Sequence, residues 1–239
     1  WVASFIENVE TVKVLLTAKV INVNQADNYG YTPLFIASLQ RNANTVKVLL
    51  AAKNINVNQA EKGGCTPLYI ASEKGHVDIV KVLLAAKDIN VNQADKYGCT
   101  PLYAASQNGH TDVIQQLLTM NGIDLNKDFK GTSPLHKAID KNHIEIIQLL
   151  KDASAAYTTK EAVAANDMIY IQQWITDDNE KDTNEINESL YTASSSGNIE
   201  IVKLFLNLKD INVNYSNIDG GTSLIIACQN KHPTIVELL

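Results

Sequence analysis

Apolar residues recur along the chain in short runs with a helical spacing. In the segment from 61 to 94, intervals of three or four positions place four apolar residues on one face of a helix: Val77, Val80, Leu83 and Leu84. Asp78 lies in the first turn, where the positive end of the helix dipole favours an acidic side chain. The same pattern predicts further short helices at Val12 to Leu16, Val46 to Leu50, Val113 to Leu118, Ile144 to Leu150 and Ile199 to Leu206.

A shorter helix is predicted before the helix at Val77. Thr66 suits the N-cap, Pro67 the first helical position and Gly75 a left-handed stop, so this helix is expected at about 67 to 73. A fixed period of 20 to 50 residues indicates a repeat protein. The Thr-Pro-Leu phrase has a period of 34 residues, with a fourth, Ser-Pro-Leu copy one residue early: the copies begin at Thr32, Thr66, Thr100 and Ser133.

A second phrase, Ile-Asn-Val-Asn, keeps the same period. Its copies and variants begin at Ile21, Ile55, Ile89, Ile123 and Ile211. The segments 58 to 64 and 92 to 98 mix asparagine, acidic residues, lysine and glycine, a composition typical of exposed turns whose side chains cap their own backbone. We therefore expect a hairpin-like finger between successive helix pairs.

Together these phrases resemble the ankyrin repeat: Gly-x-Thr-Pro-Leu-x-x-Ala, then Gly-His, then a Val-Val-x-Leu-Leu type of helix, then Val-Asn. The resemblance covers the whole chain. It implies an all-α repeat solenoid, an ankyrin-repeat array of helix-turn-helix units with hairpin-like fingers. About eight units are expected, the first and last incomplete, at about 1–26, 27–60, 61–94, 95–127, 128–152, 153–182, 183–216 and 217–239.

One departure from the family pattern concerns the residue after Thr-Pro-Leu. The histidine usual at this position survives as His136, and aromatic residues replace it in four units: Phe35, Tyr69, Tyr103 and Tyr191. In those units we expect aromatic packing between neighbouring repeats instead of the family's threonine–histidine hydrogen bond.

The regular period fails between residues 151 and 188. Aligning Ile171 with Ile114 makes Ala162 the equivalent of Ala105, so the helices return about ten residues too soon. This irregularity predicts a local change in the curvature of the array.

The shortened stretch still carries a helix pair. The segment from 151 to 157 is too short for a finger, but 161–166 and 168–175 read as helices. We expect a single domain over 1–239 with a local change of curvature, rather than two independent domains.

The next connection, from 176 to 188, is rich in acidic residues, with Lys181 as its one basic residue. We interpret it as a solvated acidic loop, with a partner-facing acidic patch as the alternative. Its acidic residues are Asp177, Asp178, Glu180, Asp182, Glu185 and Glu188.

Composition narrows the class of protein. An apolar fraction of 45% and a charged fraction of 19% predict a folded, soluble chain. The net charge of −6 and the single arginine, Arg41, argue against nucleic acid as a partner. No apolar run reaches the roughly 18 residues of a membrane span, and the start at Trp1 does not resemble a signal peptide, so no membrane insertion is expected.

The three cysteines are expected to be free thiols. Cys65 and Cys99 occupy the same place in successive units, about 10 Å apart if units stack at helix-packing distance, whereas a disulfide allows about 7 Å. Free thiols favour an intracellular, cytoplasmic protein, or the host cytoplasm for a secreted bacterial effector. Lys62 and Lys96 lie near the thiols in sequence and suggest lowered pKa values, but repeat duplication explains the pair better because no neighbouring histidine supplies a base.

One cluster, formed by His136, Asp140 and His143, suggests metal binding or acid–base chemistry. His136 is the motif residue of the family, and no cysteine or glutamate completes a known ligand spacing. The Gly-His position also recurs, at His76, His110, His143 and His232. We therefore expect structural histidines, no metal or cofactor, and no enzymatic activity.

The resemblance implies that a partner binds on a concave surface made of finger tips and first helices. The positions that the motif leaves free define this surface, which we call the finger strip: Asn28, Tyr29, Tyr31, Leu39, Gln40, Lys62, Glu73, Lys74, Lys96, Tyr97, Gln107, Asn108, Phe129, Lys130, Asp140 and Lys141.

Aromatic residues in turns are the best contact candidates, because rigid aromatic side chains anchor protein interfaces. These are Tyr29, Tyr31, Tyr97 and Phe129. The alternative is that the rings pack against the adjacent finger. Recurrent lysines on the strip favour an acidic or amphipathic partner: Lys62, Lys96 and Lys130.

The sequence thus predicts a monomeric scaffold that binds a partner protein of unknown identity. The chain begins inside one unit at Trp1 and ends inside a helix at Leu239, from which we expect a longer protein. The alternative function is therefore the targeting arm of a larger enzyme or host-directed bacterial effector, with catalysis outside this sequence.

Overall fold

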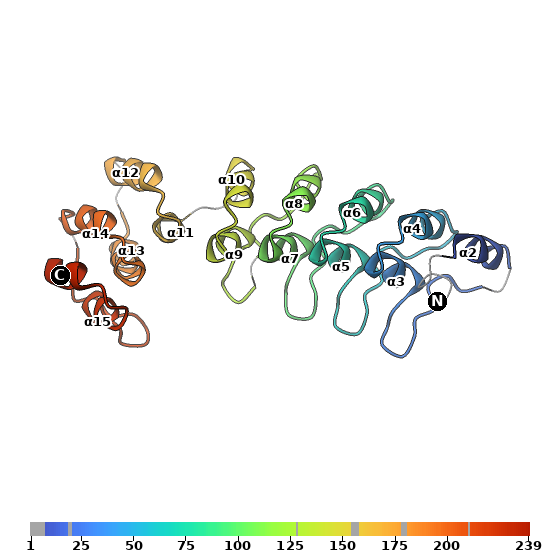
Figure 1. Cartoon of the computed structure of the whole chain (residues 1–239), viewed down its shortest axis with the longest axis horizontal. Helices are drawn as coiled ribbons and strands as arrows, with labels where there is room; N and C mark the ends of the chain where they lie inside the picture. Colours follow the sequence, from blue (N-terminus) through green and yellow to red (C-terminus); the bar gives the residue numbers. More distant parts are fainter. Residues whose placement is uncertain (1–7, 19–20, 128, 154–157, 178–180, 210) are drawn as a thin grey trace. The chain divides into compact units, whose positions relative to one another are not determined.

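The chain is helical over the residues that the structure describes. In a computed structural model, fifteen helices lie within residues 8–18, 21–127, 129–153, 158–177, 181–209 and 211–239 (Figure 1). This confirms the predicted all-α repeat solenoid. The start of the first predicted unit, residues 1–7, and residues 154–157 of the shortened segment lie outside the described residues.

The chain divides into two compact units, residues 1–156 (unit 1) and residues 157–239 (unit 2). The division falls inside the stretch where the sequence period fails. That the whole chain forms a single domain stays a prediction.

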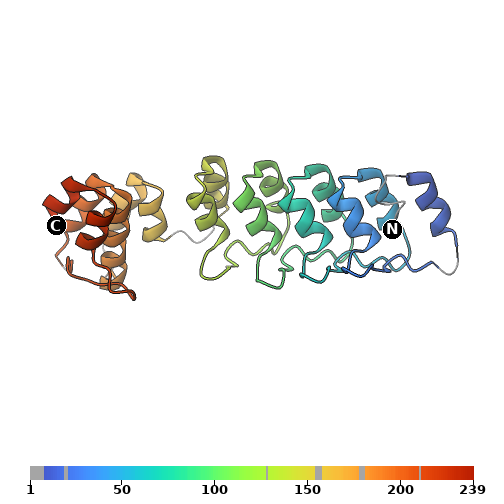
Figure 2. The same ribbon diagram turned by 60° about the horizontal axis from the view of Figure 1, so that its bottom comes forward.

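In unit 1, first helices form one row and second helices another, while the fingers lie side by side beyond the first-helix row (Figures 1 and 2). The first helices are α3 (Pro33–Leu39), α5 (Pro67–Glu73), α7 (Pro101–Asn108) and α9 (Pro134–Asp140). The second helices are α2 (Val9–Leu16), α4 (Ala43–Leu50), α6 (Val77–Leu84), α8 (Thr111–Leu117) and α10 (Ile144–Asp152).

The Thr-Pro-Leu phrase starts each first helix as predicted. In α5 the Thr66 hydroxyl accepts a hydrogen bond from the Tyr69 backbone N–H at 3.0 Å, and Pro67 occupies the first turn. Leu68 and Ala71 are fully buried. The predicted bounds of this helix, 67 to 73, are confirmed.

The predicted apolar face of α6 is partly wrong. Ile79, Val80 and Leu83 are the fully buried residues, whereas Val77 and Leu84 are half-buried. The second helix contacts its own first helix and the second helices of both neighbouring repeats, α4 and α8, so its buried face includes Ile79.

The Ile-Asn-Val-Asn phrase joins successive repeats through an asparagine side chain. The Asn58 amide donates to the Asp88 carbonyl at 2.7 Å, and its oxygen accepts from the Asn90 backbone N–H at 2.9 Å. Asn24 and Asn92 make the same pair of bonds to their following repeats. Each such asparagine satisfies two main-chain groups of the next repeat, which links neighbours without apolar contact.

The Gly-His pair forms a second link between repeats. The His110 imidazole hydrogen-bonds through Nε2 to the Glu73 carbonyl of the preceding repeat, at 2.9 Å. A β-carbon at Gly75 would lie 2.6 Å from Nδ1 of the same ring. The glycine of one repeat therefore makes room for the histidine of the next.

Hydrogen bonds hold the finger backbones in place. The Glu61 carboxylate accepts from the backbone N–H groups of Gly63 and Cys65 at 2.7 and 3.0 Å. Successive fingers are joined by main-chain bonds, from Lys62 N–H to the Tyr29 carbonyl at 3.2 Å and from Lys96 N–H to the Gly63 carbonyl at 2.9 Å. The fingers are thus hydrogen-bonded to one another.

Unit 2 has the same helix-pair organisation. Its helices are α11 (Thr159–Ala164), α12 (Met168–Thr176), α13 (Thr183–Ser196), α14 (Ile199–Leu206), α15 (Ser223–Gln229) and α16 (Pro233–Leu238). Ala162 in α11 is fully buried, as is Ala105 in α7, in agreement with the predicted equivalence. Helix α11 starts earlier than predicted because Thr158 and Glu161 form a capping box.

The predicted acidic loop at 176–188 is wrong over its second half, because α13 already begins at Thr183. Asp182 caps the helix by accepting from the Asn184 N–H at 2.9 Å, and Ile186 is buried one turn before Leu190. Asp178 and Glu180 lie outside the described residues. The acidic residues of 183–188 therefore belong to a packed helix.

Candidate protein-binding surface

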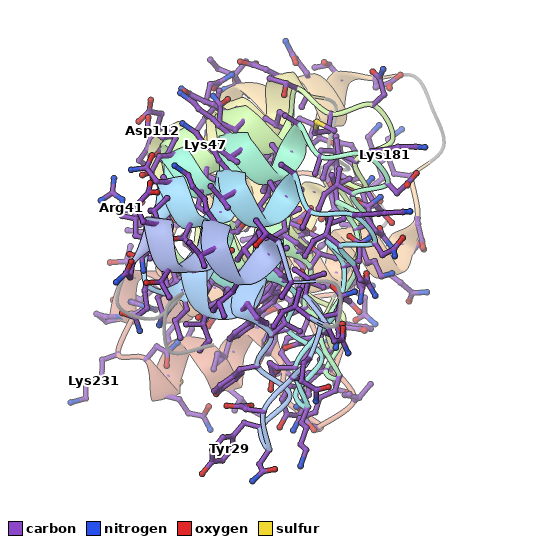
Figure 3. All side chains as sticks on the ribbon, turned by 90° about the vertical axis from the view of Figure 1, so that its right-hand side faces the viewer. Tyr29, Arg41, Lys47, Asp112, Lys181 and Lys231 are labelled. Carbon is purple, nitrogen blue, oxygen red and sulfur yellow. The ribbon has the colours of Figure 1, made fainter. Side chains whose placement is uncertain are left out.

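The finger strip presents exposed side chains on unit 1. Tyr29 and Tyr97 are 67% and 64% exposed, and Figure 3 shows Tyr29 at the end of a finger, pointing away from the helices. Glu73 is half-buried, and the remaining polar and charged positions of the strip are exposed: Asn28, Gln40, Lys62, Lys74, Lys96, Gln107, Asn108, Lys130, Asp140 and Lys141.

Two of the four aromatic candidates pack against first helices. The Tyr31 ring stacks on Phe35 with a centroid distance of 4.9 Å, and Phe129 meets Tyr103 edge-on at 5.6 Å. Both Tyr31 and Phe129 are partly buried. Tyr31 and Phe129 therefore pack within the array. Tyr29 and Tyr97 are the exposed rings of the four, and Tyr29 stacks on Tyr31 with a centroid distance of 5.8 Å.

The charges on the fingers are unevenly available to a partner. Three fingers of unit 1 have a carboxylate that accepts backbone N–H groups of its own turn, supplied by Asp27, Glu61 and Asp95. The lysines instead extend into solvent, with Lys96 Nζ 4.9 Å from the centroid of the Tyr97 ring. The finger tips therefore combine cationic and aromatic groups.

The aromatic residues that replace the family histidine are core residues in unit 1. Phe35, Tyr69 and Tyr103 are 4%, 8% and 3% exposed, which is consistent with the predicted packing. Tyr69 and Tyr103 form a cluster with Cys99, against which Cys65 also packs.

All three cysteines are free thiols. Burial, followed by the hydrogen bond with Glu61, raises the pKa of Cys65 to about 12. Burial and the nearby charge of Asp95 raise the pKa of Cys99 to about 11. The suggestion that neighbouring lysines lower these pKa values is therefore wrong.

Alkylation by iodoacetamide at pH 8 should separate the three thiols. The thiolate fractions corresponding to the raised pKa values are about 10⁻⁴ for Cys65 and about 10⁻³ for Cys99, so both react slowly, whereas the exposed Cys228 reacts first. Peptide mass spectrometry over time measures each rate, and denatured protein serves as the control in which all three react. Equal rates for Cys65 and Cys228 in the folded protein would contradict this assignment.

The histidine and aspartate cluster is spread over separate structural contacts. His136 Nε2 lies 3.5 Å from Asp140 Oδ1, whereas the His143 ring hydrogen-bonds to the Gln107 carbonyl of the preceding repeat at 3.4 Å. Within the described part of the chain, no group of three His, Cys, Asp or Glu residues is arranged to hold a metal ion.

Unit 2 contains a cavity of about 320 Å³ that no sequence pattern predicted. It lies between α11, α13 and the last finger, and its lining includes Lys160, Glu188, Tyr191, Tyr215 and Asn217. Lys160 Nζ and Glu188 Oε2 are 3.5 Å apart. Tyr191, at the position of the family histidine, and the finger residue Tyr215 were the available signals.

The described helices are also too short or too polar to cross a membrane.

The repeated helix pairs, the bonds between repeats and the row of fingers define a helical-repeat solenoid that presents a side-chain surface along its repeats. The family model for ankyrin repeats (3 copies) matches residues 1–95, 88–162 and 160–239. The chain therefore belongs to the ankyrin-repeat family, whose repeats are in general protein–protein interaction modules. No curated protein matches the sequence.

Proposed function

We propose that the chain is a non-catalytic scaffold that binds one partner protein on the finger strip, the concave side of the array, with Tyr29 and Tyr97 as anchors. The observation that carries this proposal is the exposure of both rings on fingers whose backbones are hydrogen-bonded. A preorganised surface loses little conformational entropy on binding, and aromatic anchors supply much of the binding free energy.

The sequence spacing of the two tyrosines suggests how a partner is seated. Tyr29 and Tyr97 are separated by two repeat periods, and Gly63 occupies the equivalent position of the finger between them. The middle finger therefore has no side chain at this position, which leaves room for a partner segment between the two rings. Exposed lysines at Lys62 and Lys96 favour acidic residues in that segment.

The remaining parts of the proposal follow from composition and chemistry. A net charge of −6 disfavours nucleic acid, and free thiols favour a cytoplasmic setting. We also propose that the chain is a monomer.

The test compares the proteins that immobilised parent chain and a Tyr29→Ala/Tyr97→Ala variant capture from a cytosolic lysate. Tyr31 and Phe129 are left unchanged because their rings pack against first helices. We expect at least one protein whose affinity for the variant falls about thirtyfold, as for the loss of interface anchors.

A matched control is Asn44→Ala/Gln115→Ala, two exposed polar residues on the second helices α4 and α8. The control should retain the partner. Equal capture by parent and tyrosine variant, or equal loss in both variants, would rule out the finger strip as the binding surface.

A further inference from the structure

A second surface lies on the row of second helices in unit 1, away from the finger strip. Two cavities of about 490 and 510 Å³ lie along α2, α4 and α6. Figure 3 shows Lys47, which lines the larger cavity, on the opposite side of unit 1 from Tyr29. This surface is separate from the one proposed above.

The two cavities are the same site repeated. The apolar lining of the first includes Leu16, Ile21, Val23, Val48, Ala51 and Ala52. The residues 34 positions later in the sequence line the second: Leu50, Ile55, Val57, Val82, Ala85 and Ala86. Ala51 and Asn54 line both cavities, so the two cavities are adjacent.

Each cavity is also lined by two lysines, at equivalent positions of the repeat. Lys13 and Lys53 line the first, and Lys47 and Lys87 line the second. Asp88 is the one acidic residue among the lining residues, and Lys13 is paired with Glu10 at 2.7 Å in an exposed ion pair of little strength. The groove is therefore apolar at its floor and cationic at its rims.

We propose that this outer groove, formed by the two cavities, binds an acidic amphipathic helix that has apolar residues seven positions apart. Repeats stack at about 10 Å, and seven helical residues advance by about 10.5 Å through nearly two turns, so both apolar side chains face the groove. Glutamate or aspartate side chains on the helix flanks meet the lysine rims.

Other backbone forms fit the groove less well. In an extended strand, side chains about 10 Å apart are three positions apart and point to opposite faces. A polyproline helix has the required spacing, but its grooves are lined by aromatic residues, and no aromatic residue lines either cavity. The helix is therefore the occupant that the lining favours.

At the third equivalent position the lining loses apolar and cationic residues. The residues corresponding to Val82, Ala85 and Lys87 are Gln116, Thr119 and Asn121, which are polar and uncharged. The site is therefore confined to the repeats that end with α6.

The probe for the test is a fluorescein-labelled helix of glutamate and alanine, stapled because short helices are marginal in water, with two leucines seven positions apart. Fluorescence anisotropy measures its affinity for the parent chain and for Lys47→Glu/Lys87→Glu. We expect saturable binding by the parent and a loss of affinity of about tenfold or more in the variant.

Two controls separate this site from general charge attraction. Lys209→Glu/Lys231→Glu changes the net charge equally but at exposed lysines of unit 2, and should keep the affinity within about twofold. A probe with its leucines five positions apart, on nearly opposite helix faces, should bind about tenfold more weakly. Absence of saturable binding by the parent, equal losses in both lysine variants, or indifference to leucine spacing would overturn the proposal.

Discussion

Replacing Phe205 by alanine should lower the free energy of unfolding of unit 2 by about 3–5 kcal/mol, as expected for the loss of a large buried aromatic side chain. Phe205 is fully buried in α14, and its ring centroid lies 6.2 Å from that of Trp174. It belongs to a cluster that also contains Leu190 from α13 and Ala227 from α15. Its truncation therefore removes contacts among several helices of the unit.

Hydrogen exchange followed by mass spectrometry measures this effect helix by helix. Exchange should accelerate in α13 and α14, because their hydrogen bonds open with the unit. Ile169→Ala, at a position that is 71% exposed on α12, is the control and should change stability by no more than about 0.5 kcal/mol. Unchanged exchange in Phe205→Ala would contradict the core assignment.

The same variant tests whether the chain is one domain. Thermal unfolding in a single transition would support the predicted domain over 1–239, since a cooperative array unfolds as one. Two separate transitions would show that units 1 and 2 unfold independently.

Replacing Gly64 by alanine should cost about 2–4 kcal/mol, the sum of backbone strain and a lost hydrogen bond. Gly64 has a φ of +88°, and a β-carbon there would lie 2.5 Å from the Lys96 backbone nitrogen. That nitrogen donates to the Gly63 carbonyl in the bond between two fingers. The finger must therefore move, and the bond is lost.

Gly131 provides a matched control for this substitution. Gly131 lies two fingers after Gly64, directly before the Thr-Ser-Pro segment, and has a φ of +75°. No described atom would lie within 4 Å of a β-carbon at Gly131. Gly131→Ala should cost only about 1 kcal/mol, from the left-handed backbone alone. Chemical denaturation measures both, and equal costs would show that the contact between fingers contributes nothing.

The fold was predictable because its local signals agree. Thr66 and Pro67 favour the start of a helix, and their recurrence with a fixed period leaves few alternatives to a repeat array. The helix that begins at Thr183 was missed because a cluster of acidic residues is typical of loops. Ile186 and Leu190 are one helical turn apart and are both buried in α13. This apolar spacing was the sequence signal for the helix, and it should have been given more weight than the acidic composition.

The candidate site was less predictable, because exposure in a turn depends on neighbours that are distant in sequence. Tyr29 and Tyr31 are two positions apart in one finger, yet only Tyr31 stacks on Phe35. Likewise, Cys65 is close to Lys62 in sequence, but burial and Glu61 determine its pKa. Proximity in sequence indicates which groups lie near a side chain. It does not indicate which of those groups determines the side chain's exposure or its pKa.

The asparagine links between repeats have a consequence for how such a chain can evolve. Asn58 bonds to main-chain atoms of Asp88 and Asn90, and Asn92 bonds in the same way to Gly122 and Asp124, so the side chains of the receiving residues take no part. A duplicated or deleted repeat thus finds a compatible neighbour without a compensating mutation. Gene-level gain and loss of repeats can then change the length of the array while surface residues diverge separately.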